Sequence, residues 1–161
     1  VMNHAIMKSL LFLCAGAFIH AIGTRNIDSL TGIAHRMPVT GIFFTVGILA
    51  ISGIPPFNGF ISELMILLAT LKAGMIIFAA IMLGNILLGF AYYLRILYVI
   101  LWQSPKENST HVKEAPILML FPMAILVLLS ITIGIWPDPF VTFANQAAAA
   151  TLNLTSYISA T

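Results

Sequence analysis

Charged residues are scarce in this sequence. Asp, Glu, Lys and Arg together make up 7% of the 161 residues, whereas 60% are hydrophobic, and the mean hydropathy is strongly positive. These values exclude a soluble domain with a large core and indicate an integral membrane protein. The net charge is only +2 and no run of Lys or Arg occurs, so nucleic acid is not an expected partner.

Cysteine and the usual catalytic motifs are also missing. Cys14 stands alone, which excludes a disulfide framework or a clustered thiol site, and it is interpreted as a small buried apolar residue. There is no glycine-rich phosphate loop, no pair of histidines at metal-binding spacing, no nucleophile elbow and no nicotinamide or flavin fingerprint. We therefore expect no bond-breaking chemistry, no cofactor and no metal site in this chain. The few ionisable side chains suit the movement of a proton or a cation.

Long apolar runs are what the sequence has in abundance. A membrane-spanning helix needs about 20 mostly apolar residues, and no alternating strand pattern occurs, so we predict an all-α, polytopic transmembrane helix bundle. The second and third segments are short for a full span, which predicts that they are tilted within the protein or that one is unwound midway. The about five expected helical segments are 2–22, 38–54, 57–71, 75–102 and 116–136.

The ends and links of the chain carry weaker signals. Residue 1 is Val, and an apolar segment follows without the basic region and cleavage site of a signal peptide, as expected for the later part of a longer or split polypeptide. Residues 1–139 are predicted to form the transmembrane bundle. Residues 140–161 carry no charge and are expected to lie along the membrane, to pack on a partner helix or to fray. Residues 103–115, which include His111, are expected to form an aqueous loop.

A helix break is predicted within residues 53–63. Pro55 and Pro56 lack backbone N–H groups and disfavour helical geometry in the residue before them, while Gly59 tolerates a tight path. The helix is therefore expected to stop at 54–58. In hydrocarbon the freed backbone groups need partners, so such a break lies at the membrane surface or inside protein around a wet cavity.

Four ionisable side chains are candidates for proton transfer. Glu63 follows the break within about two helical turns, where an ionisable group is costly and is a functional candidate by default. His4 and Lys8 are four residues apart and so share one face of a helix, and this pair suits reversible proton transfer. His20, near the far end of the same helix, is a candidate for passing protons to an interface.

Each candidate has a plainer interpretation. Glu63 is alternatively a carboxylate that accepts hydrogen bonds from backbone amides freed at the break, and Lys8 a lysine that reaches towards lipid headgroups. His20 is as readily explained by a bond to a loop carbonyl. Asn85, in the middle of the fourth segment, either forms a hydrogen bond between helices or holds a water molecule, and packing is favoured.

Several motifs occur together and in order along the first hundred residues. They are His4-Ala-Ile-Met-Lys8-Ser-Leu-Leu-Phe-Leu-Cys-Ala-Gly16, Thr24-Arg-Asn-Ile-Asp28, Arg36-Met-Pro38, Gly53-Ile-Pro-Pro-Phe-Asn-Gly-Phe-Ile-Ser-Glu63 and Tyr92-Tyr-Leu-Arg95. Jointly they resemble the later half of the antiporter-like membrane subunits of respiratory complex I, coenzyme F420 dehydrogenase, membrane-bound hydrogenases and multisubunit sodium/proton antiporters.

The resemblance implies roles for two residues. Lys8 falls on the family's lysine of the central hydrophilic axis, and Glu63 falls on a lysine or glutamate that serves the proton channel in an interrupted helix. Glutamate at this position resembles the complex I chain 4 and hydrogenase types more than the sodium-antiporter types, which tend to have lysine. The family's earlier half, with its own glutamate–lysine pair, has no counterpart in these residues.

We therefore expect part of a proton-translocating subunit of a redox-driven ion-pumping complex. A sodium/proton antiporter subunit and a structural membrane scaffold are the two alternatives. The implied partners are other membrane subunits, including the missing earlier half or its split counterpart, the lipid bilayer, and protons or sodium. Iron–sulfur clusters, a flavin or a nickel–iron site are expected only in partner subunits. The implied location is an energy-transducing membrane, of a prokaryotic cell rather than an organelle.

Overall fold

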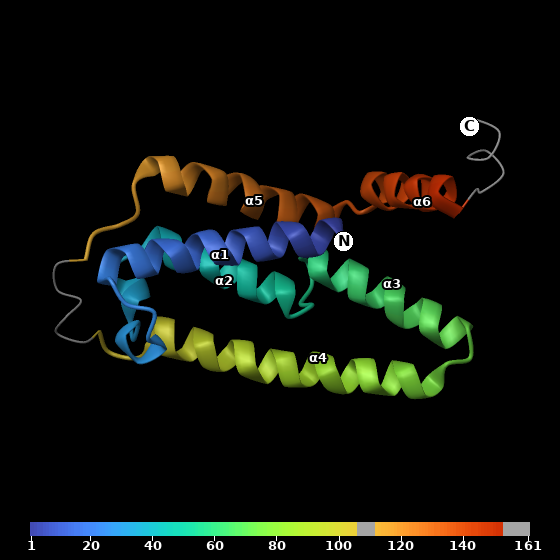
Figure 1. Ribbon diagram of the computed structural model, residues 1–161, viewed down its shortest axis with the longest axis horizontal. Helices are drawn as coiled ribbons and strands as arrows, with labels where there is room; N and C mark the ends of the chain where they lie inside the picture. The colour runs from blue at the N-terminus through green and yellow to red at the C-terminus, as the bar shows by residue number, and fades with distance from the viewer. Residues whose placement is uncertain (106–111, 153–161) are drawn as a thin grey trace.

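The chain folds into a bundle of helices (Figure 1). The computed structural model describes residues 1–105 and 112–152, and within these ranges it contains no β-strand. This confirms the predicted all-α membrane bundle. The α-helices of the described residues are α1 (Met2–Ile22), α2 (Pro38–Ile51), α3 (Asn58–Lys72), α4 (Ile76–Leu97), α5 (Ile117–Ile135) and α6 (Asp138–Leu152).

Shorter helical turns complete the described chain. Two 3-10 turns, η1 (Ile27–Ser29) and η2 (Ile33–His35), form the polar link between α1 and α2. A π-helical turn, η3 (Tyr98–Trp102), extends α4. Residues 106–111, which include His111 and part of the expected aqueous loop, and residues 153–161 of the tail lie outside the described residues.

Helix α2 ends earlier than predicted, at Ile51 rather than at residue 54. The reason is Gly53, whose φ of 69° takes the backbone into the left-handed region before the prolines are reached. The amide of Gly53 donates to the carbonyl of Ala50, and the amide of Ile54 donates to that of Leu49. These two bonds form a Schellman motif, which satisfies carbonyls at the end of α2.

The helices fall into long membrane spans and two shorter pieces. Among the described residues, three helices are long and apolar enough to cross a membrane, namely α1, α4 together with η3, and α5. A fourth is added if the bent pair Ile27–His35 and Pro38–Ile51 counts as one span. Helices α2 and α3 have 14 and 15 residues, fewer than the about 20 that a full span needs.

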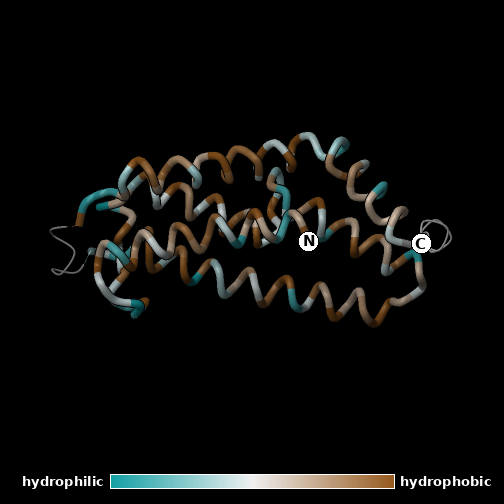
Figure 2. Tube along the Cα trace, turned by 45° about the horizontal axis from the view of Figure 1, so that its top comes forward, coloured by the Kyte–Doolittle hydropathy of each residue, from teal (hydrophilic) through white to brown (hydrophobic). Residues whose placement is uncertain are grey.

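Helices α2 and α3 follow one another in the same direction, with the break between them (Figure 1). Helix α4 returns beside both of them and makes contacts with each. The chain is therefore arranged as one interrupted helix, α2 and α3, next to one continuous helix. Hydrophobic residues run along the helices, and hydrophilic residues gather in the links at the left-hand end (Figure 2).

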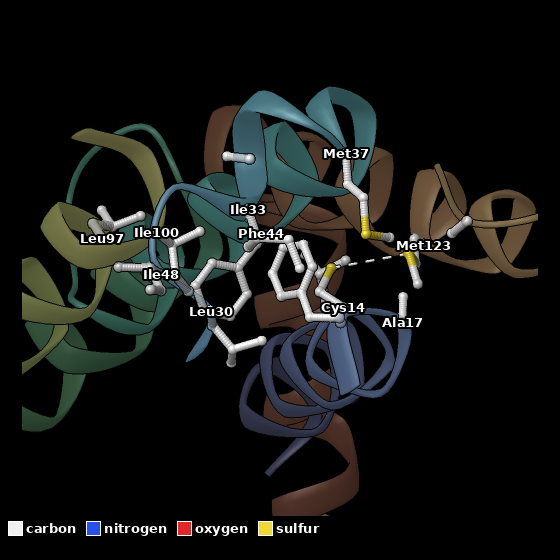
Figure 3. Packing of buried hydrophobic residues seen from close by; sticks show 14 of the residues in the cluster. Cys14, Ala17, Leu30, Ile33, Met37, Phe44, Ile48, Leu97, Ile100 and Met123 are labelled. Atoms are coloured by element: carbon white, nitrogen blue, oxygen red, sulfur yellow. Dashed lines mark hydrogen bonds between the residues drawn. The ribbon is translucent and has the colours of Figure 1, made fainter. Parts of the chain in front are cut away.

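A packed core fills the space between α1, α2 and α5 and reaches the end of α4 (Figure 3). Phe18 and Phe44 meet edge to face with ring centroids 5.5 Å apart. Cys14 is buried, with its Sγ 3.9 Å from the Sδ of Met123, which agrees with its interpretation as a small apolar residue. Close packing of this kind is what holds helices together in lipid. The core fixes α1 and α2 beside the break.

Candidate proton-transfer site

Four helices meet at the break. The side chain of Asn58 is fully buried, and its Oδ1 accepts a hydrogen bond of 2.7 Å from the Oγ of Ser130. The Nδ2 of Asn3 donates to the backbone carbonyl of Asn58 at 3.0 Å. These bonds connect the start of α1, the start of α3 and α5, at the point where α2 has just ended. The polar network therefore holds the Asn58 end of the predicted break inside the protein, while Pro55 and Pro56 themselves are exposed.

The network was missed by the sequence reasoning. Asn3, Asn58 and Ser130 are far apart in the sequence, and each is an ordinary polar residue when considered alone. The one signal in the sequence was that each of these polar side chains lies in an apolar segment, where polar residues commonly form hydrogen bonds between helices.

Gly59 lies where α2 and α3 come closest. A Cβ atom at this position would overlap the backbone carbonyl of Ala50, in the last turn of α2. Only glycine allows the two backbones to approach so closely. Gly59 was predicted as part of the break for its conformational freedom, and the structure shows that its missing side chain is used for packing.

Glu63 lies directly against the end of α2. A Cβ atom on Gly53 would overlap the Oε2 of Glu63, so the carboxylate is in contact with the turn that ends α2. The amides of Ser52, Gly53, Ile54 and Phe57 donate to backbone carbonyls instead of to this carboxylate. These four amides of the break are thus satisfied without Glu63. The plainer interpretation of Glu63 as their acceptor loses its main support.

Three of the predicted proton carriers line one cleft, called here the His4–Glu63 cleft. His4 and Lys8 come from α1, Glu63 from α3, and Tyr93 from α4. The cleft has a volume of about 390 Å³. A water molecule occupies roughly 30 Å³ of liquid, so the cleft has room for a chain of water molecules. The sequence placed no basic residue near Glu63, and the tertiary structure brings Lys8 to the same cleft.

The residues of this cleft differ in exposure. His4 and Lys8 are exposed in the described chain, while Glu63 is partly buried. Lys8 also lines a second groove of about 410 Å³ formed by α1, α2 and α4, together with Tyr92 and Tyr93. The structure therefore places the ammonium-bearing side chain at the mouth of the site and the carboxylate deeper within it.

His20 is separate from this group. It is 16 residues from His4 on the same helix, which corresponds to about 24 Å along the axis. It is exposed and lines another cleft, of about 300 Å³, with Lys113 and Glu114. The structure thus does not bring His20 together with the other three candidates.

Glu114 is a further functional residue that the sequence did not reveal. Its carboxylate accepts hydrogen bonds from the amide of Val39 at 2.8 Å and from the hydroxyl of Thr40 at 2.6 Å. These groups belong to the first turn of α2, where unpaired amides and the helix dipole favour a negative charge. Glu114 lies in the link before α5, within the loop predicted at 103–115, and the structure shows that it also caps α2. Within residues 1–105 and 112–152, no group of three or more His, Cys, Asp or Glu side chains could hold a metal ion.

Together, the fold and the cleft define a multi-pass helical membrane protein with ionisable side chains gathered at a broken helix. Residues 1–89 match the family described as "NADH:quinone oxidoreductase/Mrp antiporter, TM". The match covers more than half of the chain, and the chain belongs to this family. This confirms the resemblance found in the ordered motifs.

Individual relatives agree with this assignment. The chain is 32% identical over 158 residues to F(420)H(2) dehydrogenase subunit N of Methanosarcina mazei, covering 90% of this chain and 31% of the relative. It is 31% identical over 167 residues to a Na(+)/H(+) antiporter subunit of Bacillus subtilis, covering 99% of this chain and 32% of the relative. The chain thus spans about a third of the length of these relatives.

Two solved structures have a similar fold. One is an archaeal membrane-bound sulfane sulfur reductase, with a TM-score of 0.75, 31% identity and coverage of 82% of this chain and 22% of that chain. The other is the Mrp complex of Dietzia sp. DQ12-45-1b, with a TM-score of 0.85, 22% identity and coverage of 98% of this chain and 37% of that chain. The second likeness supports the fold alone.

Proposed function

We propose that this chain is part of a proton-translocating membrane subunit of a redox-driven ion-pumping complex. The observation that carries the proposal is the His4–Glu63 cleft, in which His4, Lys8 and Glu63 from two helices face one space large enough for water. Membership of a family that contains proton-translocating and antiporter subunits supports it. His20 is proposed as a separate relay at the other end of α1, next to Lys113 and Glu114.

The proposed relay uses side chains that exchange protons without other chemistry. Lys8 and His4 give up or take up a proton at a nitrogen atom, and Glu63 does so at a carboxylate oxygen. Water in the cleft bridges distances that the side chains do not span. The break places the partly buried Glu63 in the second turn of α3. The break is tolerated because four of its amides donate to backbone carbonyls and the carbonyl of Asn58 accepts from the side chain of Asn3.

The partners and cofactors belong to the same proposal. The chain works with other membrane subunits, including the part that corresponds to the rest of its relatives' length. The iron–sulfur clusters, flavin or nickel–iron site that drive pumping reside in partner subunits, and this chain carries out no redox step. The organisms of the relatives favour a prokaryotic energy-transducing membrane.

A sodium/proton antiporter subunit is the second candidate function. The similarity to the Na(+)/H(+) antiporter of Bacillus subtilis favours it. Glutamate rather than lysine at position 63 favours the redox-driven type. A sodium-dependent pH gradient in vesicles without an electron donor would decide for the antiporter.

The test of the proposed function is Glu63→Gln in the intact complex reconstituted into vesicles. Glutamine keeps the size and most hydrogen bonds of glutamate but does not release a proton, so packing survives and the relay does not. We expect fewer protons moved per electron, with assembly and electron transfer to soluble acceptors retained. Asp138→Asn, an equivalent change at the exposed start of α6, serves as the control and leaves pumping unchanged. A normal proton gradient in Glu63→Gln vesicles would instead favour a structural scaffold.

A further inference from the structure

A second cleft lies on another side of Glu63, and the relay described above makes no use of it. It has a volume of about 310 Å³ and is enclosed by the end of α2, by α3 and by the middle of α4. It is called here the Ser52–Asn85 cleft. Its lining includes Ile51, Ser52, Glu63, Asn85 and Tyr93.

The polar side chains of this cleft lack partners of their own. The Oγ of Ser52 is buried and has no hydrogen-bond partner among the described residues, and Ser52 as a whole is 8% exposed. Buried hydroxyl groups are almost always hydrogen-bonded, to protein or to an ordered water molecule. Asn85 projects from the middle of an apolar helix and is exposed. Both residues therefore have hydrogen-bonding capacity available for water in the cleft.

Glu63 connects the two clefts. Glu63, Ile51 and Tyr93 line both the His4–Glu63 cleft and the Ser52–Asn85 cleft. Around Glu63, the other titratable side chains of these clefts are His4 and Lys8 from α1 and Tyr93 from α4. The basic groups lie in the first cleft, and the second offers only neutral polar groups besides Glu63 itself. A proton can therefore reach Glu63 from the His4–Glu63 cleft, which holds the basic groups, and leave through the Ser52–Asn85 cleft, whose other polar groups are neutral.

We propose that Ser52 and Asn85 hold water in the second cleft and that this water receives the proton from Glu63, which makes the Ser52–Asn85 cleft the continuation of the path beyond Glu63. In this step the O–H bond of the Glu63 carboxylic acid breaks, its electron pair stays on the carboxylate, and the proton forms a new O–H bond on the water molecule. Ser52 and Asn85 are positioning residues, because they orient the water and do not change protonation state. The inference rests on the proposed role of Glu63.

The experiment compares variants of the intact complex in vesicles. Ser52→Ala and Asn85→Leu remove the proposed water partners, singly and together, and Ser52→Thr keeps the hydroxyl. Thr70→Val on α3 and Asn145→Leu on α6 are matched controls that line neither cleft. The readouts are the proton-to-electron ratio and the infrared C=O stretching band of Glu63, assigned by its loss in Glu63→Gln.

We expect the double variant to lower the proton-to-electron ratio towards that of Glu63→Gln and to shift the Glu63 band. The single variant Ser52→Thr, which keeps the hydroxyl, is expected to retain the wild-type ratio and band. A ratio or a band that stays as in the wild type overturns the inference while the proposed function stands. Normal pumping by Glu63→Gln overturns the proposed function, and this inference with it. If the double variant does not assemble, a high-resolution map of the wild-type complex decides, because absence of water density at hydrogen-bonding distance from the Ser52 Oγ contradicts the proposal.

Discussion

At the scale of single residues, the site depends on a few polar side chains in apolar helices. Lys8 and Glu63 were identified from the sequence because an ionisable residue in a membrane segment is costly. Their meeting in one cleft was not predictable, because they are separated by a complete helix, two 3-10 turns and the break. Glu114 was missed because its partners, Val39 and Thr40, lie more than seventy residues earlier in the chain.

Changes at Lys8 test whether it exchanges protons or only supplies charge. Lys8→Ala is expected to lower proton pumping less cleanly than Glu63→Gln, since it also leaves a small void and removes a charge near the carboxylate. Lys8→Arg keeps the charge, but a guanidinium does not release its proton, so pumping stays low. Proton uptake per electron in vesicles is the measurement. Lys72→Ala, at the exposed end of α3, is the control. Normal pumping by Lys8→Arg would show that charge alone is needed.

Gly53 and Gly74 provide a matched pair for testing contact with Glu63. Both adopt a positive φ, of 69° and 73°, so alanine at either position costs about 1–2 kcal/mol of backbone strain. A Cβ at Gly53 also collides with Glu63, whereas one at Gly74 meets nothing within 4 Å. We expect both variants to lose similar thermal stability and only Gly53→Ala to lose pumping. Equal pumping by the two variants would show that the position of the Glu63 carboxylate is not critical.

At the scale of elements, the break between α2 and α3 is the main feature. Its existence was predictable because Pro55 and Pro56 remove backbone donors, whatever surrounds them. Its first residue was not, because the left-handed Gly53 ends α2 before the prolines do. The close approach of α3 to α2 at Gly59 depends on the tertiary packing of both helices, and no local pattern encodes it.

Gly59→Ala is expected to destabilise the bundle by about 1–3 kcal/mol, because the added methyl group forces α3 away from the Ala50 carbonyl. Gly84→Ala on α4 is the matched control. A Cβ there meets nothing within 4 Å, and alanine is the better helix former by about 1 kcal/mol. Thermal unfolding of the detergent-purified complex is the measurement. A lower midpoint for Gly84→Ala than for Gly59→Ala would contradict this account of the packing.

At the scale of the whole molecule, the chain exposes large apolar side chains and also one lysine of the candidate site. Many large hydrophobic side chains of α4 are exposed, including Ile77, Leu87 and Leu88. Such surfaces suit lipid or neighbouring membrane helices. Lys8 is exposed in the described chain as well, and a lysine among acyl chains costs about 3 kcal/mol on insertion scales.

The assembled complex should therefore enclose both charged groups. We expect the Lys8 ammonium and the Glu63 carboxylate to contact protein or water, and not acyl chains, once the other membrane subunits are in place. A structure of the complex in lipid, with its bound lipids resolved, provides the check. Either group in contact with acyl chains would count against the pumping role.

The sequence by itself determined the class of fold, the approximate position of five helical segments and the family, but not the helix α6 or the end of α2. Composition and the lengths of apolar runs fix these features, because a backbone in hydrocarbon must satisfy its own hydrogen bonds and therefore forms helices. Lys8 and Glu63 could be identified from the sequence because a charged side chain in a membrane segment is costly.

Only the tertiary structure decided which of these residues work together. It grouped His4, Lys8 and Glu63 and set His20 apart. It also placed Asn58 against Ser130 and Gly53 against Glu63. Contacts of this kind join helices that are distant in the sequence, and they depend on how side chains of many different segments fill space, which no local pattern records.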